Sequence, residues 1–291
     1  MGPLLRSMRP AQWAKNLFVL APLVFGGLLL SASAVGRAAL ALAAFCCASS
    51  AVYLINDLRD REEDRRHPLK RLRPLAAGTL SVAAAVAAVA VLSAAAVALA
   101  IWLGRSFAFI LAGYLVLNLL YTLWFKHLVI LDVMSLSLGF VLRVEAGAQA
   151  MGVEVSRWLF LCTIFLALFL AFSKRRHEII LLAGEAASQR PVLDHYSPAF
   201  LDQMINVVTA SSVVSYALYA VAPETVAKYH TQNLVFTIPL VLYGIFRYLY
   251  LMYQRPGERN PTEAILRDPP FLINMLLWGI AVVLIVYGRQ G

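Results

Sequence analysis

Nine apolar stretches, separated by short polar segments, constrain the fold of this chain more than any other feature of its 291 residues. Helices formed by such stretches are suited to cross a hydrocarbon core of about 30 Å. Charged residues make up 14% of the sequence, against roughly 25% in soluble domains. We therefore predict an all-α polytopic membrane protein that forms a single domain over residues 1–291. The nine predicted transmembrane helices span residues 17–35, 38–55, 80–103, 107–125, 128–148, 158–172, 204–221, 234–253 and 271–287.

The Lys and Arg residues are unevenly divided between the two sides of the predicted membrane. On the side of the N-terminus lie 18 of the 25, and the opposite side has five. The positive-inside rule then places the N-terminus and the charged loops in the cytoplasm and the C-terminus outside. A bacterial inner membrane fits this arrangement best. A cleaved signal peptide is the alternative for the first stretch, because small residues follow it at 31–34, but the predicted topology needs it as a helix.

The net charge and the cysteines exclude several other classes of protein. A formal net charge of +9 could indicate nucleic-acid binding, but most basic residues lie at the ends of apolar stretches, where they set membrane topology. We therefore expect no nucleic-acid partner. The three cysteines lie inside apolar stretches, without the spacing of a zinc site or a disulfide framework. The oligomeric state stays open at this stage.

The densest group of charges lies at residues 53–78 and is where we expect the chemistry. If residues 54–65 are helical, then Asn56, Asp57, Asp60 and Asp64 project from roughly one face. Amide and carboxylate oxygens are hard ligands suited to Mg²⁺, which usually takes one or two protein carboxylates and completes its octahedron with water and substrate phosphate. The spacing therefore predicts a site for Mg²⁺ and a bound diphosphate.

Three cations directly downstream, Lys70, Arg71 and Arg73, are candidate ligands for the oxygens of that diphosphate. The alternative is that the whole segment is a solvated cytoplasmic loop, which is the common fate of charge runs. A solvated loop has no need to place like charges on one helical face, where they repel each other. We therefore favour the metal and phosphate site.

Polar residues at or within other apolar stretches are further candidates. Lys15 is a candidate phosphate ligand, although Trp13 and Lys15 could instead anchor the chain at the membrane interface. Arg143 lies deep in a predicted span, where an ionisable side chain costs about 2.5–3.5 kcal/mol on insertion scales and indicates a functional site. Its alternative is a structural pair with Asp132 or Glu145.

The sixth predicted helix ends in a basic run. Lys174 and Glu178 would share a face there at i and i+4. The alternative for this run is a signal that only sets topology.

The charged segment also resembles a known motif. The run NDLRDREED at residues 56–64 matches the NDxxDxxxD signature of the UbiA superfamily of membrane prenyltransferases, and the basic residues after it resemble the usual continuation of that motif. The chain is similar to this family over essentially its whole length. The resemblance implies a UbiA-like helix bundle whose active-site cavity faces the cytoplasm. It also implies Mg²⁺ ligation by Asn56, Asp57, Asp60 and Asp64, the three aspartates being catalytic.

Shorter stretches resemble a narrower branch, the decaprenyl-phosphate phosphoribosyltransferases. This resemblance implies transfer of 5-phosphoribose from 5-phosphoribosyl 1-diphosphate to a polyprenyl phosphate, with release of diphosphate, in arabinose-donor synthesis for the cell envelope. It also implies that side chains of these stretches bind the substrates. These residues are Lys15, Asn16, Tyr121, Lys126, Arg143, Lys174, Arg175 and Glu178.

One departure from the wider family supports the narrower branch. Typical relatives that use prenyl diphosphates carry a second acidic motif, DxxxD, after the sixth helix, whereas this chain has KRRHE at residues 174–178. Cations at this place suit substrates that are rich in phosphate.

Two alternative functions follow from the same residues. The nearer one is a conventional UbiA-type prenyltransferase that alkylates an aromatic or quinone precursor with an isoprenyl diphosphate, and the missing second motif argues against it. The other is a non-enzymatic transporter whose buried charges line a pathway. Polar residues that gather at the cytoplasmic ends of the helices, away from the midplane, argue against a transporter.

Overall fold

The computed structural model describes residues 2–67, 70–181, 191–254 and 267–288, and within these ranges the regular structure is entirely helical. The chain forms two compact units. The first comprises Met1–Leu119 and Leu142–Val155, and the second comprises Leu120–Val141 and Ser156–Gly291. Two helices, α6 and α7, pass from one unit into the other. The prediction of a single domain stays a prediction.

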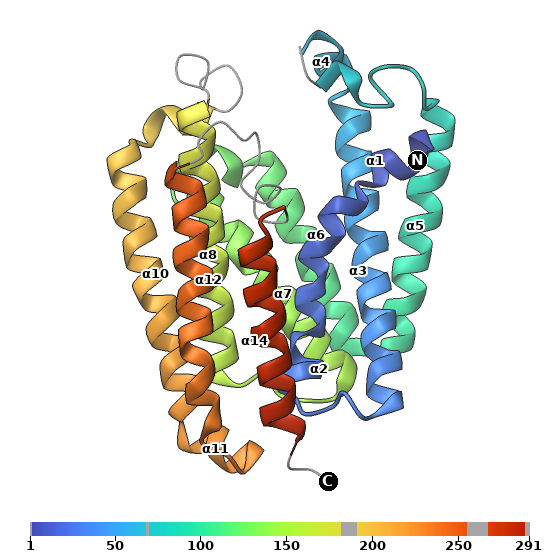
Figure 1. Cartoon of the computed structure of the whole chain (residues 1–291). Coiled ribbons are helices and arrows are strands. Elements are labelled where there is room, and N and C mark those ends of the chain that lie inside the picture. Colours follow the sequence, from blue (N-terminus) through green and yellow to red (C-terminus); the bar gives the residue numbers. More distant parts are fainter. Residues whose placement is uncertain (1, 68–69, 182–190, 255–266, 289–291) are drawn as a thin grey trace. The chain divides into compact units, whose positions relative to one another are not determined.

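The first unit is built around a long helix, α3, that packs along α5 (Figure 1). Alanines of both helices meet at this contact, and small side chains allow membrane helices to approach closely. Phe45 fills the core beside them, with its ring 6.0 Å from that of Phe107 and 5.1 Å from that of Tyr114. The helices of this unit are α1 (Pro3–Met8), η1 (Pro10–Leu20), α2 (Ala21–Phe25), α3 (Ala32–Arg59), α4 (Arg61–Arg66), η2 (Lys70–Leu72), α5 (Val82–Leu103), most of α6 (Arg105–Leu123) and the second half of α7 (Leu131–Met151).

The first predicted transmembrane helix differs from the structure. Instead of one helix over 17–35, the chain forms the 3₁₀-helix η1, continues into the short α2, and turns at Gly26 and Gly27 before α3 begins. Gly27 has a φ of 77°, which favours glycine because side chains with a Cβ rarely adopt it. Ser31 caps the new helix by accepting a hydrogen bond from the amide of Ala34. Hydropathy does not indicate this turn, because the residues of the turn are themselves apolar or small.

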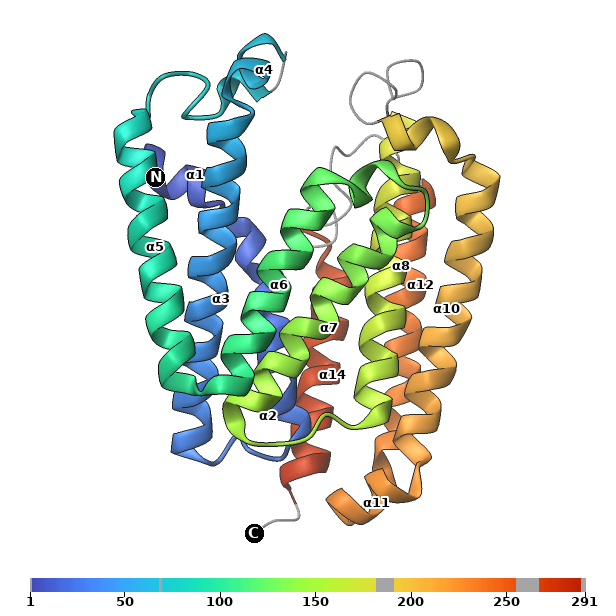
Figure 2. The ribbon, with the colours of Figure 1, turned by 180° about the vertical axis from the view of Figure 1, so that it is seen from behind.

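The second unit packs α8, α10 and α12 against one another, as both Figure 1 and Figure 2 show. Its core contains Phe169, Leu201, Ile205 and Tyr248, and the rings of Phe169 and Tyr248 lie 4.9 Å apart. Besides the end of α6 and the first half of α7, the helices of this unit are η3 (Phe125–His127), α8 (Arg157–Leu181), η4 (Pro191–His195), α10 (Pro198–Val221), α11 (Pro223–Tyr229), η5 (Asn233–Thr237), α12 (Ile238–Gln254) and α14 (Pro269–Tyr287).

Seven helical segments of the described chain are long and apolar enough to cross a membrane, which confirms an integral membrane protein. They are α3, α5, α6, α8, α10, η5 with α12, and α14. Two predicted spans are not among them. Helix α7 is 21 residues long but carries Asp132, Arg143 and Glu145, and the first span is interrupted as described above. The count of nine, the sidedness of the termini and the orientation of a cavity stay predictions.

Candidate functional site

The acidic motif lies where α3 gives way to α4. Helix α3 ends at Arg59, Asp60 caps it, and α4 follows at once. The condition that residues 54–65 are helical is therefore met except at Asp60. The backbone nevertheless stays close to helical, since the amide of Asp60 donates to the carbonyl of Asn56 (2.9 Å) and the amide of Asp64 donates to the carbonyl of Asp60 (2.8 Å). The acids thus remain about one turn apart.

The structure brings two of these acids together with two arginines, a group that we call the Asp57–Asp64 cluster. Arg73 Nη1 donates to Asp57 Oδ1 at 3.2 Å and to Asp64 Oδ2 at 2.6 Å. Arg9 Nη2 donates to the same Asp57 oxygen at 2.5 Å. The two carboxylate side chains are only 2% and 4% exposed, whereas the side chains of Arg9 and Arg73 are each 30% exposed. The four side chains carry no net formal charge.

Arg9 belongs to this cluster through an unusual backbone conformation. It lies between α1 and η1 with φ 55° and ψ 63°, in the left-handed region that residues other than glycine seldom adopt. Its guanidinium also lies 4.8 Å from the centre of the Tyr53 ring, at cation–π distance. Sequence reasoning did not select Arg9 as a site residue, because its partner Asp57 is 48 positions away along the chain.

The carboxylates of the cluster are suitable ligands for a divalent metal, but in this structure they contact the guanidinium group of Arg73. Asp57 and Asp64 both direct an oxygen at one nitrogen, Arg73 Nη1, so a positive charge already lies between them. Two carboxylates, with water and phosphate oxygens, suffice for Mg²⁺. Among the described residues, no three His, Cys, Asp or Glu side chains are arranged to hold a metal. Asn56 and Asp60 are half-buried, and their role as ligands stays a prediction.

Arg143 is the centre of a second polar group in the same unit. Its Nε donates to Asn16 Oδ1 at 2.9 Å and its Nη2 to the Tyr114 hydroxyl at 2.8 Å, and Asn16 in turn donates to Ser49 Oγ at 3.2 Å. Asn16 is fully buried. The alternative pairing of Arg143 with Asp132 is wrong. Both residues lie on α7, 11 positions apart, which corresponds to about 16 Å along the helix axis.

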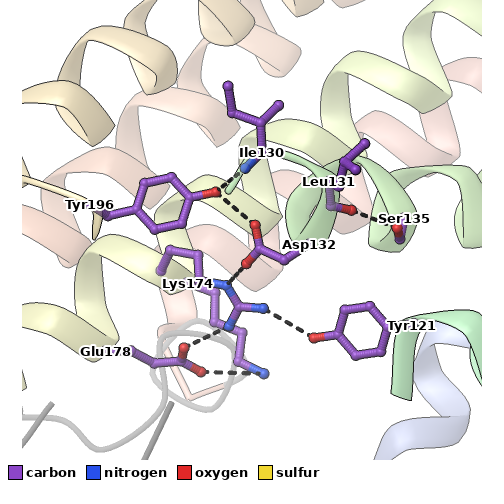
Figure 3. A network of polar contacts seen from close by, with 9 residues as sticks. Tyr121, Ile130, Leu131, Asp132, Ser135, Lys174, Glu178 and Tyr196 are labelled. Atoms are coloured by element: carbon purple, nitrogen blue, oxygen red, sulfur yellow. Dashed lines mark hydrogen bonds and ion pairs between the residues drawn. The ribbon is translucent and has the colours of Figure 1, made fainter. Parts of the chain in front are cut away.

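In the second unit, Arg175 bonds to Asp132, Glu178 and Tyr121, which are labelled in Figure 3. Its Nε donates to Asp132 Oδ2 at 2.7 Å, its Nη1 to Glu178 Oε2 at 2.7 Å and its Nη2 to the Tyr121 hydroxyl at 3.2 Å. The Arg175 side chain is 1% exposed. Lys174, which is exposed, lies 3.8 Å from Glu178 Oε1. This arrangement favours Arg175 as a residue that positions Tyr121 and Glu178. Its contact with substrate stays a prediction.

Asp132 and Tyr196 complete this network, and sequence reasoning did not select them as site residues. Tyr196 donates its hydroxyl hydrogen to Asp132 Oδ1 at 2.7 Å and accepts from the amide of Ile130 at 2.6 Å. Burial and the bond to Asp132 raise the pKa of Tyr196 above its usual value. Ile130 has a φ of 69°, which is a rare conformation for a β-branched residue. A carboxylate one turn into an apolar stretch was a usable signal for Asp132, whereas nothing in the sequence indicated Tyr196.

The other predicted phosphate ligands lie in partly or fully accessible positions. Arg71 is exposed, while Lys15, Lys70 and Lys126 are half-buried. The backbone amide of Lys70 donates to His67 Nδ1 at 3.3 Å, which fixes the start of η2. Their contacts with phosphate stay predictions.

Comparison with known proteins decides the family. The UbiA prenyltransferase family matches residues 19–280, which is most of the chain. The chain belongs to this family. It is 34% identical to a protein named decaprenyl-phosphate phosphoribosyltransferase from Corynebacterium glutamicum, over 98% of this chain and 86% of the relative. A protein of the same name from Mycolicibacterium smegmatis is also 34% identical, over 94% of this chain and 89% of the relative.

Solved structures of the UbiA family share the fold. A UbiA homologue from Archaeoglobus fulgidus bound to DMAPP and Mg²⁺ superimposes with a TM-score of 0.72 at 24% identity, covering 97% of this chain and 99% of the other. The all-helical UbiA fold is therefore confirmed. As a member of the UbiA prenyltransferase family with these relatives, the protein is a transferase, and the transporter alternative is wrong.

Proposed function

We propose that this UbiA-family protein transfers 5-phosphoribose from 5-phosphoribosyl 1-diphosphate to a polyprenyl phosphate of the decaprenyl type and releases diphosphate. The observation that carries the proposal is the 34% identity, over nearly the whole chain, to proteins named decaprenyl-phosphate phosphoribosyltransferase. The basic run at the end of α8, where a second acidic motif is absent, supports a phosphate-rich pair of substrates. The product would serve arabinose-donor synthesis for the cell envelope.

In this reaction the bond between C1 of the ribose and the diphosphate breaks, and a bond forms between C1 and an oxygen of the polyprenyl phosphate. The acceptor is already an anion, so no general base is needed. The protein has to position the two substrates and exclude water. The ribose passes through a state with oxocarbenium character, as in other glycosyl transfers.

Asp57 and Asp64, with Asn56 and Asp60, would hold Mg²⁺ in the first unit. Two buried carboxylates that share one cation support this assignment. When bound, Mg²⁺ supplies positive charge that stabilises the diphosphate as it leaves. The A. fulgidus homologue with DMAPP and Mg²⁺ gives a precedent for a metal in this fold.

Each unit has its own candidate phosphate ligands in this proposal. In the first unit they are Lys15, Lys70, Arg71, Arg73 and Arg143, with Asn16 bonded to Arg143. In the second unit Lys126 and Lys174 bind phosphate directly, and Arg175 holds Tyr121 and Glu178 in place. The polyprenyl tail stays in the lipid. We place the protein in a bacterial inner membrane with the acidic motif on the cytoplasmic side.

The experiment is a transfer assay with purified full-length protein, Mg²⁺, phosphoribosyl diphosphate labelled in the ribose, and a polyprenyl phosphate. We expect the label to enter the organic phase, and EDTA or Asp64→Asn to abolish this transfer. Glu63→Gln is the matched control, because Glu63 is an exposed neighbour in α4 and should keep the rate. Absence of transfer, with prenylation of an aromatic acceptor by an isoprenyl diphosphate instead, would establish the conventional prenyltransferase.

A further inference from the structure

The Asp57–Asp64 cluster is neutral without any metal. Two carboxylates and two guanidinium groups compensate one another through three contacts of 2.5, 2.6 and 3.2 Å. Buried carboxylates need such partners, because an isolated buried charge is strongly unfavourable. The two arginines therefore act as counter-cations of the two carboxylates.

A metal ion cannot bind Asp57 Oδ1 and Asp64 Oδ2 together while Arg73 stays in place. Its Nη1 atom lies between Asp57 Oδ1 and Asp64 Oδ2. Mg²⁺ lies about 2.0–2.1 Å from each oxygen ligand, so it would occupy the space that this nitrogen fills. Asp57 Oδ1 also accepts from Arg9, and a metal on this oxygen would repel that guanidinium. Metal binding through these two oxygens thus requires at least Arg73, and in part Arg9, to leave them.

The displaced arginines need an anion. Mg²⁺ alone would convert the neutral cluster into one with two excess positive charges beside buried groups. A diphosphate removes this excess, because its oxygens can accept from both guanidinium groups, and arginine matches phosphate geometry well. The arginine side chains are 30% exposed, whereas those of the carboxylates are 2% and 4% exposed. An arriving anion can therefore reach the arginines first.

We propose that Arg9 and Arg73 are exchangeable counter-cations that make the binding of metal and of diphosphate depend on each other. Resting on the proposed function, this inference adds Arg9 as a ligand of the donor diphosphate. Without the anion the arginines compete with the metal for Asp57 and Asp64. With the anion they move to its phosphate oxygens, and the carboxylates become available. Each ligand then raises the affinity of the other by the same factor, as linkage requires.

The test measures Mn²⁺ binding to the purified full-length protein by electron paramagnetic resonance, at buffered free Mn²⁺, with and without inorganic diphosphate. We expect weak Mn²⁺ binding to the wild-type protein alone, and an affinity at least about tenfold higher with diphosphate, within the usual range of coupling between sites. In Arg73→Gln, the affinity for Mn²⁺ alone should rise and the effect of diphosphate should shrink. Arg9→Gln should change both in the same direction, by less.

Two further variants keep the test decisive. Arg65→Gln is the matched control, because Arg65 pairs with the exposed Glu62 outside the cluster, and its Mn²⁺ affinity should equal that of the wild type. Arg73→Lys retains the positive charge and should keep Mn²⁺ binding weak, even if Arg73→Gln fails to fold. Two results would overturn the exchange. One is a folded Arg73→Gln variant whose Mn²⁺ affinity is unchanged or lower than that of the wild type. The other is an Arg73→Lys variant that binds Mn²⁺ as tightly as Arg73→Gln. If the wild-type protein binds no Mn²⁺ even with diphosphate, and transfer survives EDTA, the proposed metal-dependent function itself fails.

Discussion

At the scale of single residues, Asp132 connects the groups of the second unit that we assign to substrate binding. One of its oxygens accepts from Arg175 and the other from Tyr196, and its side chain is fully buried. Arg175 in turn bonds to Glu178 and Tyr121. Asp132 therefore acts on substrate only through other side chains, as a positioning residue.

We predict that Asp132→Asn leaves Arg175 with less compensating charge. Removing one partner of a buried pair typically costs about 3–5 kcal/mol, and because Glu178 still pairs with Arg175 we expect the lower end. Thermal unfolding in detergent measures this loss, and the KM for the phosphoribosyl donor should rise as Tyr121 and Glu178 lose their fixed positions. Ser135→Ala, which removes only a bond within the same helix, is the control. Wild-type stability and KM in Asp132→Asn would show that the network is dispensable.

Tyr196 gives a prediction that depends on pH. Its pKa is raised by burial and by the bond to Asp132, so the folded protein favours the protonated hydroxyl. The stabilisation from this bond is fully present below about pH 10, the usual pKa of tyrosine, and is lost as the pH rises further. Tyr196→Phe should lower the free energy of unfolding by about 1.5–3 kcal/mol, as for hydrogen bonds to charged groups. The difference from wild type should stay constant from pH 6 to about 9; a difference that changes across this interval would contradict the assignment.

At the scale of helices, the close approach of α7 to η1 depends on Gly147. A Cβ at this position would lie 2.0 Å from the backbone carbonyl oxygen of Val19, which is far inside van der Waals contact. Arg143, one turn earlier on α7, reaches Asn16 on η1. The absence of a side chain at Gly147 therefore lets α7 come near enough for this hydrogen bond.

We predict that Gly147→Ala forces the two helices apart and costs about 1–3 kcal/mol, as overpacking does, together with a loss of activity through Arg143. Gly113→Ala is the matched control, because Gly113 is helical in α6 and a Cβ there meets nothing within 4 Å. Alanine is the better helix former by about 1 kcal/mol, so the control should unfold at the same or a higher temperature. Equal melting temperatures for Gly147→Ala and wild type would show that the two helices accommodate the added Cβ without loss of stability.

The sequence predicted most of the long helices, but it did not predict which side chains pair with one another. Hydropathy located the long helices because each one is a local, contiguous signal. The turn at Gly26 and Gly27 escaped it, since glycines between apolar residues do not interrupt an apolar stretch. Motif spacing selected Asp57 and Asp64, but it could not show that Arg9 pairs with Asp57, because no local pattern links positions 48 residues apart. The roles of the selected residues in binding metal and phosphate remain predictions that only the variants above can test.

At the scale of the whole molecule, the number of membrane crossings decides which charged segments can reach the same compartment. In the part of the chain that the structure describes, seven helical segments meet the criteria of length and apolarity, and two others, η1 with α2 and the charged helix α7, do not. If both of these cross, the total is nine, and if neither does, it is seven. Either odd total leaves the C-terminus on the side opposite the N-terminus. A crossing by only one of them would bring both termini to the same side.

We predict nine crossings, because the positive-inside rule places the acidic motif and the basic end of α8 together in the cytoplasm. Paired fusions of green fluorescent protein and alkaline phosphatase at three sites can check this. A fusion after Arg66, at the end of α4, should fluoresce, and one after Gly152, at the end of α7, should show phosphatase activity, as should one at the C-terminus. A seven-crossing chain without η1–α2 and α7 would also carry phosphatase at its C-terminus, but it would hold residues 66 and 152 on one side. The fusion after Arg66 therefore separates the two odd topologies, because in the seven-crossing chain it would show phosphatase activity. That result would also contradict the cytoplasmic placement of the acidic motif, on which the proposed use of a soluble donor depends.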